Sequence, residues 1–221
     1  MAISPTESAS AEFLRTVPST ILSDVLTRVG LTTRMVGLDP LRPGLKVFGR
    51  AFTMRYAPKR GFGTTPYGLY KVLNQVSAGQ VLVVDGLGAT LAVWGELATL
   101  TARRQGAVGA VLDGCTRDAE AIRDLGFPVF SRGVHLEAYG SGIEIVGVNE
   151  TIHCCGAQVR ANDLLVGDDD GVVVVPSERI DEVAEAARLL VDLESEFRAR
   201  LDAGAGGDEL QQLVMKKYAK G

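Results

Sequence analysis

An apolar run that leads directly into an Arg-Asp pair limits the possible folds of this chain more than any other segment. Residues 107–112 are apolar at every position, which is typical of a strand covered on both faces. Asp113-Gly114 is expected to end this strand with a turn. Arg117 and Asp118 then lie between the strand and the next helix. Ligands of open α/β sheets bind at this edge, so the sequence predicts an α/β fold with a site at Arg117-Asp118.

The remaining periodicity predicts alternating helices and strands in the first half and mostly short strands in the second. Helices are expected over residues 16–29, 66–76, 91–104, 117–125, 177–200 and 209–217. Strands are expected over 51–56, 80–85, 107–112, 128–131, 143–148, 153–159, 164–166 and 172–175. Asp168-Asp169-Asp170-Gly171 lacks the spaced ligands and terminal glutamate of an EF-hand, so a turn between two strands is predicted there.

Composition excludes several classes of protein. A chain of 221 residues, 46% of them hydrophobic, can bury one substantial core, which favours a single compact domain. Lys and Arg total 23 against 27 Asp and Glu, with a pI near 5.3, so no basic surplus indicates a nucleic-acid ligand. No stretch approaches the ~20 apolar residues that span a bilayer, and the first residues do not resemble a signal peptide. We therefore expect no membrane association and a cytoplasmic location.

The three cysteines, Cys115, Cys154 and Cys155, are expected to be free thiols. Their number is odd and two are adjacent, which suits neither a disulfide framework nor a CxxC metal motif. Cys115 lies two residues before Arg117, so a catalytic thiol is one interpretation. A nucleophilic cysteine needs a base or a lowered pKa, and the chain has only two histidines. We favour a small residue on the wall of the pocket.

Three motifs together give a family resemblance. Trp94-Gly95-Glu96-Leu97-Ala98-Thr99, the Arg117-Asp118 pair, and the segment from Gly167 to Pro176 resemble the RraA-like family in residues and order. That family includes class II 4-hydroxy-4-methyl-2-oxoglutarate (HMG) and 4-carboxy-4-hydroxy-2-oxoadipate aldolases, and proteins that inhibit a ribonuclease. The resemblance implies a layered β/β/α swivelling-domain fold. It also implies an RraA-like catalytic domain over 18–204, preceded by an N-terminal extension (1–17) and followed by a C-terminal tail helix (205–221).

The resemblance also assigns roles to residues. In the aldolases, the aspartate matched by Asp118 binds a divalent metal, Mg²⁺ or Mn²⁺, and the arginine matched by Arg117 contacts the substrate's keto oxygen. The acidic position matched by Glu96 holds a metal-bound water and counts as catalytic. The substrate carboxylate is received by backbone N–H groups at the positions of Gly95, Glu96, Leu97 and Ala98.

Each assignment has a structural alternative. Asp118 could cap a helix beside a solvated Arg117. Gly95 could lie inside a continuous helix, and Glu96 could be a surface residue. Glu194 or Glu196 matches a glutamate that reaches a neighbouring subunit's site in the aldolases, although each could be an ordinary solvated residue.

Three further residues could be given a functional role, but a surface or structural role is favoured for each. Lys71 is better read as a surface lysine than as a Schiff-base lysine. His135 and His153 lack a third metal ligand, so structural roles are predicted for both.

The sequence therefore predicts a homo-oligomeric metal-dependent lyase, a trimer or hexamer, that cleaves a 4-hydroxy-2-oxo acid to pyruvate and decarboxylates oxaloacetate. The alternative is a non-catalytic ring that binds and regulates a ribonuclease. A third interpretation is a related activity on another oxo acid, since Thr64, Tyr67 and the loop from Arg132 to Tyr139 could shape a distinct pocket.

Overall fold

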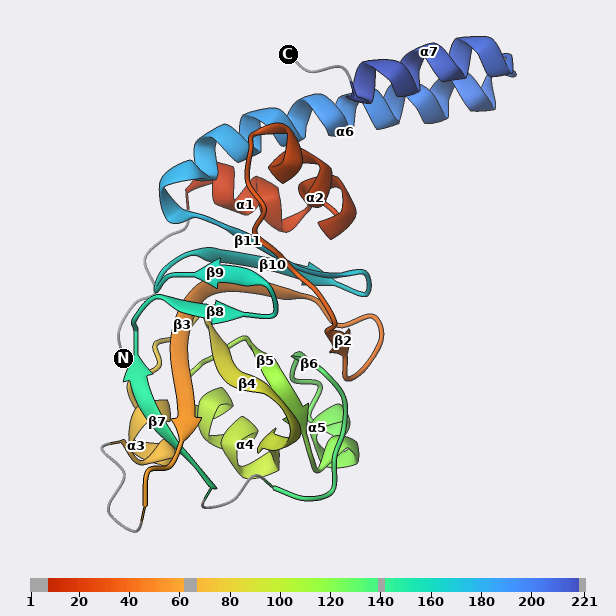
Figure 1. The fold of residues 1–221 in the computed structure, drawn as a ribbon. Helices are drawn as coiled ribbons and strands as arrows, with labels where there is room; N and C mark the ends of the chain where they lie inside the picture. Colours follow the sequence, from red (N-terminus) through yellow and green to blue (C-terminus); the bar gives the residue numbers. More distant parts are fainter. Residues whose placement is uncertain (1–7, 62–66, 139–141, 219–221) are drawn as a thin grey trace.

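The computed structural model describes residues 8–61, 67–138 and 142–218, and a mixed β-sheet forms its centre (Figure 1). The strands run in the order β1-β11-β10-β3-β4-β5-β6-β2, and β7 also pairs with β3. Strands β3 to β6 are parallel, and the other pairs are antiparallel. The bounds are β1 Arg34–Met35, β2 Asp39–Pro40, β3 Val47–Pro58, β4 Gln80–Trp94, β5 Gly109–Thr116, β6 Val129–Ser131, β7 Ile143–Val148, β10 Leu164–Asp168 and β11 Gly171–Val175.

Helices and a hairpin cover this sheet in layers. Helices α3 (Leu69–Leu73), α4 (Glu96–Arg104) and α5 (Ala119–Asp124) accompany the parallel strands on one face. The hairpin of β8 (Ile152–Cys154) and β9 (Ala157–Val159) packs on the other face. The predicted α/β class and layered β/β/α fold are therefore confirmed. The remaining helices are α1 Ala9–Arg15, α2 Ser19–Arg28, the 3₁₀ turn Ser177–Arg179, α6 Ile180–Asp202 and α7 Gly207–Tyr218.

Asp113-Gly114, which was expected to end a strand with a turn, lies inside a long strand instead, and the strand expected over residues 80–85 also continues past Asp85. After Asp85, the chain loops out at Leu87 and Gly88, both at positive φ, and β4 then resumes its pairing with β5. A Cβ on Gly86 would lie 2.6 Å from the carbonyl oxygen of Asp113, so this glycine permits close strand packing. Strand β5 likewise passes through Asp113 and ends at Thr116.

This continuation corrects a helix boundary. The predicted helix over 91–104 begins only at Glu96, because Ala92 and Trp94 pair with Cys115 and Thr116 of β5. The helix predicted over 66–76 is also shorter, Leu69–Leu73, and Pro66 lies outside the described residues. The helix predicted over 117–125 begins at Ala119, which leaves Arg117 and Asp118 in the connection.

The segment predicted as one strand over 153–159 is a hairpin. Cys155 and Gly156 form its turn with φ of 50° and 88°, two positive values in succession, as a tight two-residue hairpin requires. Asp169-Asp170 joins β10 to β11, which confirms the predicted turn in the Asp-rich segment.

Helices α1, α2 and α6 form a separate layer over β10 and β11 (Figure 1). The sequence analysis did not predict α1, yet Ala11 and Leu14 are buried against this layer. Helix α6 extends beyond the sheet, and α7 folds back along its far end with Leu213 buried. The proposed domain boundaries at 17 and 204 stay a prediction. Among the described helices, none is long and apolar enough to cross a membrane.

Candidate functional site

A pocket of about 380 Å³ lies where β4 leads into α4, beside the connection from β5 to α5. Helix α3 and strands β3 and β7 supply its other walls. Five of the six predicted site residues line this pocket, and the sixth, Glu96, contacts Asp118 through its backbone N–H. The residues that line the pocket are Tyr56, Tyr67, Gly68, Leu69, Tyr70, Ala92, Val93, Trp94, Gly95, Leu97, Ala98, Arg117, Asp118, Ala138, Ile143, Glu144 and Ile145.

The backbone turns sharply to present Asp118. The Arg117 N–H donates to the carbonyl of Trp94 at 3.0 Å, and Asp118 has φ 55° and ψ 39°, in the left-handed region. Asp118 stands at the N-cap position of α5, but its side chain makes no capping hydrogen bond. The helix-cap alternative therefore does not describe this aspartate.

The Asp118 carboxylate points to the beginning of α4 instead. Its Oδ2 accepts a hydrogen bond from the Glu96 N–H at 3.1 Å and lies 3.4 Å from Nε of Arg117. Its Oδ1 has no hydrogen-bond partner within the described part of the chain. The Asp118 side chain is 37% exposed, so one carboxylate oxygen is available to a ligand.

Gly95 makes this approach possible. It is the N-cap of α4 and has extended backbone (φ −167°), so Trp94-Gly95 does not lie inside a continuous helix. A Cβ on Gly95 would lie 2.7 Å from Asp118 Oδ2 and 3.2 Å from Cγ of Arg117. The absence of a side chain therefore allows the Arg117-Asp118 pair to contact the beginning of α4.

The first turn of α4 offers donors for an anion. The N–H groups of Leu97 and Ala98 belong to this turn, and such groups have no acceptor within their own helix. The Trp94 indole donates to Thr99 Oγ1 at 2.8 Å, and that hydroxyl donates to the Gly95 carbonyl at 3.1 Å. These bonds hold the turn in place, and its amides lie beside Arg117, an arrangement of donors and positive charge that favours an anion.

The donor set at Asp118 fits a hard divalent cation. Mg²⁺ is commonly held by one or two carboxylates, with water and substrate oxygens completing its coordination. Asp118 supplies one unpartnered oxygen in an open pocket. Glu96 is half-buried, and its side chain is not among the lining groups.

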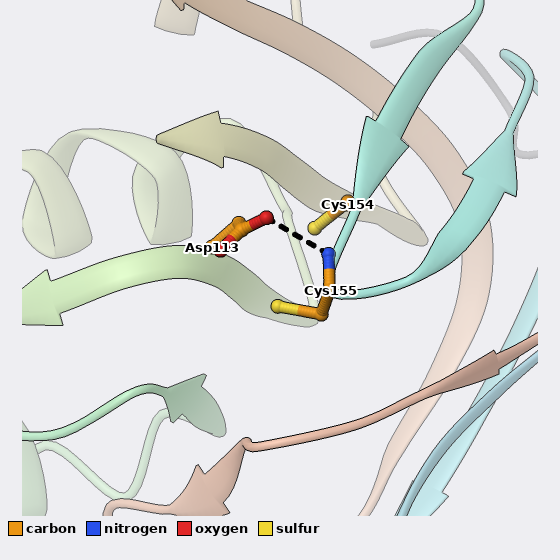
Figure 2. Close-up of side chains that lie close together, drawn as sticks. All are labelled: Asp113, Cys154 and Cys155. Atoms are coloured by element: carbon orange, nitrogen blue, oxygen red, sulfur yellow. Dashed lines mark hydrogen bonds between the residues drawn. The ribbon is translucent and has the colours of Figure 1, made fainter. Parts of the chain in front are cut away.

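A second cluster of metal-ligand types was missed by the sequence analysis. Ligand atoms of Asp113, Cys154 and Cys155 lie within 4.8 Å of one another (Figure 2). Asp113 sits on β5, and the two cysteines come from the β8–β9 hairpin. The expectation that adjacent cysteines suit no metal site rested on spacing alone, which does not reveal an aspartate from another strand.

Both carboxylate oxygens of Asp113 in this second cluster are already paired. Asp113 Oδ2 accepts from the Cys155 N–H at 2.9 Å, and Oδ1 pairs with Arg132. Burial raises the pKa of Asp113, but the hydrogen bonds from Arg132 and Cys155 outweigh it, so this pKa lies below its ordinary value. The cluster is therefore a closed structural network, in which the Arg132 guanidinium already balances the charge of the Asp113 carboxylate.

Several other predicted residues lie elsewhere. All three cysteines are free and buried, and Cys115 does not line the pocket as we expected. Glu194 and Glu196 lie on α6, where they pair with Arg198 and Arg200.

Thr64, Tyr67 and the loop from Arg132 to Tyr139 were expected to shape a distinct pocket, and part of this set lines the observed one. Tyr67 and Ala138 line it. Thr64 and Tyr139 lie outside the described residues. His135, Lys71 and His153 are not among the lining groups.

Comparison with protein families now identifies the fold. A family model described as RraA-like, Aldolase/RraA, matches residues 19–174. The chain belongs to the RraA-like family. The match spans the pocket, Arg117-Asp118 and the Asp-rich turn, as the three motifs predicted.

Individual relatives are moderately similar. Protein DlpA of Legionella pneumophila is 29% identical over 185 residues, 83% of this chain, and this chain spans only 30% of DlpA. A Halalkalibacterium halodurans protein named "Putative 4-hydroxy-4-methyl-2-oxoglutarate aldolase" is 35% identical over 79% of this chain and 80% of its own length. The crystal structure of Streptomyces coelicolor RraAS2, titled an unusual member of the RNase ES inhibitor RraA protein family, matches with a TM-score of 0.81. It is 29% identical and covers 88% of this chain and 98% of its own.

Proposed function

We propose that this RraA-like protein is a divalent-metal-dependent pyruvate aldolase that cleaves a 4-hydroxy-2-oxo acid to pyruvate and a second oxo compound, and decarboxylates oxaloacetate. The observation that carries the proposal is the free Oδ1 of Asp118, beside Arg117 and the first-turn amides of α4 in one pocket. A relative named as a putative aldolase supports the same class of reaction.

The proposed roles follow from the chemistry of each group. Asp118 would hold Mg²⁺ or Mn²⁺, which when bound supplies a Lewis acid for the substrate's keto group. The amides of Leu97 and Ala98 would receive the C1 carboxylate. The Arg117 guanidinium would present its donors to the keto oxygen, where negative charge develops.

The bond changes balance without an oxidant or reductant. In cleavage, the C4 hydroxyl loses its proton, the C3–C4 bond breaks, and its electron pair moves towards the C2 keto oxygen. Protonation at C3 then gives pyruvate, and C4 becomes a carbonyl carbon. Loss of CO₂ from oxaloacetate leaves the same pyruvate enolate. We assign Glu96 to holding the water that takes up and returns the proton.

A regulator of a ribonuclease is the second candidate, because RraAS2 carries that family name and shares this fold. A protein-binding ring has no need of an unpartnered carboxylate oxygen beside an arginine and free amides. The open pocket therefore favours the enzyme. We also propose that the active form is a homo-oligomer, a trimer or hexamer.

Oxaloacetate decarboxylation by the purified, EDTA-treated protein tests the proposal. We expect activity only after Mg²⁺ or Mn²⁺ is added, and a loss of about 10²–10³-fold in kcat for Arg117→Ala and at least as much for Asp118→Ala. Lys71→Ala serves as the control, because Lys71 does not line the pocket, and should retain activity. Metal-independent activity, or full activity of Asp118→Ala, would contradict the assignment.

A further inference from the structure

We infer that Tyr56 binds the substrate, with its phenol donating a hydrogen bond to the oxygen at C4, the atom that becomes the carbonyl oxygen of the departing product. The inference rests on the proposed function and adds to that site a residue that the three sequence motifs do not contain. Tyr56 lies on β3, outside the segments that supply Arg117, Asp118 and the first turn of α4.

The position of Tyr56 in β3 directs its side chain to the face of the sheet on which the pocket lies. Side chains alternate between the two faces of a strand, so Phe52, Met54 and Tyr56 share one face. All three belong to one core cluster, which also contains Trp94 and Ala98 from the pocket wall. Of the three, Tyr56 is the one that lines the pocket. Its ring therefore belongs to the core, and its hydroxyl lies at the pocket.

The Tyr56 hydroxyl is a polar group that the rest of the described chain leaves without a partner. Tyr56 is 7% exposed, and its hydroxyl makes no hydrogen bond within the described residues. Among the described side chains, Nε of Arg55 is the only polar atom that is sealed from solvent and lacks a partner. The Tyr56 hydroxyl is therefore not sealed, and the open space that it reaches is the pocket. A ligand oxygen that accepts its hydrogen bond is favoured there, because it breaks no bond within the protein.

The Tyr56 phenol is a hydrogen-bond donor at physiological pH. Burial, together with the nearby Tyr70, raises the pKa of Tyr56 to about 12, so the phenol keeps its proton. A protonated phenol can donate to a neutral oxygen, and it donates more strongly to an oxygen on which negative charge develops. The group therefore suits an oxygen that gains negative charge during the reaction.

The C4 oxygen is the shared oxygen of the proposed substrates that still lacks a protein donor. The proposed function assigns the C1 carboxylate to the amides of Leu97 and Ala98, and the keto oxygen to Arg117. Tyr56 enters the pocket from β3, whereas Arg117-Asp118 follow β5, and β4 lies between these two strands. The phenol therefore approaches the substrate from the side away from the pair. Its hydrogen bond would strengthen as the C4 hydroxyl loses its proton and the C3–C4 bond breaks, while Tyr56 keeps its own proton.

The test compares two 2-oxo acids of the same chain length. 4-Hydroxy-2-oxobutanoate carries the C4 oxygen, and its cleavage is followed by the release of pyruvate. 2-Oxobutanoate lacks that oxygen, and the exchange of its C3 protons with D₂O, followed by NMR with Mg²⁺ present, needs only the enolate step. In Tyr56→Phe, we expect kcat/KM for cleavage to fall at least about tenfold, as the loss of one hydrogen bond predicts. Exchange of 2-oxobutanoate should stay within about twofold of wild type, a change too small for a lost hydrogen bond.

Tyr70→Phe is the matched variant. Tyr70 also lines the pocket but is 50% exposed, so water remains a partner for its hydroxyl. We expect the ratio of cleavage to exchange in this variant to stay within about twofold of wild type. A loss of cleavage equal to that in Tyr56→Phe would overturn the assignment of the donor to Tyr56.

The outcomes separate this inference from the proposed function. Wild-type cleavage and exchange that both persist unchanged in Tyr56→Phe would overturn the inference and leave the proposed function intact. An equal loss of both rates in Tyr56→Phe would also overturn it, because the tyrosine would then support the fold and not the C4 oxygen. Wild-type protein that catalyses neither reaction with Mg²⁺ or Mn²⁺, or exchange without cleavage, would overturn the proposed aldolase and the inference with it.

Discussion

Two Arg–Asp pairs lie along the path of β5, one within the strand and one just beyond its end, and their surroundings differ. Asp113, within the strand, is 10% exposed at its side chain, and both of its oxygens have partners in Arg132 and the Cys155 N–H. Asp118, just beyond the strand's end, is 37% exposed and keeps one oxygen without a partner. We call these the closed pair (Asp113-Arg132) and the open pair (Asp118-Arg117).

The difference shows that residue type alone does not mark a site. The closed pair has cysteines nearby and resembles a metal cluster by composition, yet its hydrogen bonds are satisfied and bind the β8–β9 hairpin to the sheet. The open pair has fewer ligand atoms but leaves one available, beside first-turn amides. Stability is therefore expected to depend on the closed pair, and activity on the open pair.

Among substitutions outside the open pair itself, the largest expected effect comes from filling the space at Gly95. In Gly95→Ala, the new Cβ would lie 2.7 Å from Asp118 Oδ2 and force the open pair to move, although the extended backbone accepts alanine without strain. We expect decarboxylase kcat to fall about 10²-fold, since displacements near 1 Å have effects of this size. Steady-state kinetics measure the loss.

A matched substitution controls for the added methyl group. A Cβ on Gly206 would meet no atom within 4 Å, so Gly206→Ala should retain activity and thermal stability. Equal activity of Gly95→Ala and Gly206→Ala would show that the position of the open pair does not matter for the reaction.

A smaller effect is expected from the closed pair, and on stability. Asp113→Asn removes the charge that balances Arg132 and weakens the bond to the Cys155 N–H, so we expect a loss of about 2 kcal/mol in the free energy of unfolding. Urea denaturation measures it. Asp118→Asn is the comparison and should change stability by less than about 0.5 kcal/mol, as is usual for a partly exposed polar residue. A reversed order would contradict the division of roles.

The smallest expected effect is the pH dependence of the stability that Asp113→Asn loses. Because the pKa of Asp113 is lowered in the folded protein, its stabilising contribution is present above about pH 4 and is lost as the pH falls through the folded-state pKa. The stability difference between wild type and Asp113→Asn should therefore shrink below about pH 4. A difference that stays constant down to pH 2.5 would show that the charge of Asp113 contributes nothing.

Strand β5, which holds Asp113 and leads into Arg117-Asp118, was predictable, but its end was not. The apolar run 107–112 predicted β5, because periodicity reports burial along one segment, whereas the helix predicted over 117–125 begins only at Ala119. Asp113-Gly114 suggested a turn, because a local signal does not reveal that the glycine lets another strand pass close by. The contact of Cys154 and Cys155 with Asp113 was not predicted for a similar reason, because Asp113 comes from a strand distant in the sequence.

At the candidate site, the motifs predicted which residues gather and missed how they are held. The resemblance placed Gly95, Leu97, Ala98, Arg117 and Asp118 together, and all of them line one pocket. The left-handed backbone at Asp118 and its bond to α4 depend on tertiary contacts. The other walls of the pocket depend on α3, β3 and β7, whose residues carry no motif.

Manganese binding tests the division between the two pairs most directly. Free Mn²⁺ is measured by electron paramagnetic resonance during titration of wild type, Asp118→Asn and Asp113→Asn, each with pyruvate present to supply substrate oxygens. We predict one site per chain in wild type, loss of that site in Asp118→Asn, and its retention in Asp113→Asn under conditions where that variant stays folded. Binding that survives Asp118→Asn and disappears in Asp113→Asn would place the metal at the closed pair and contradict the account.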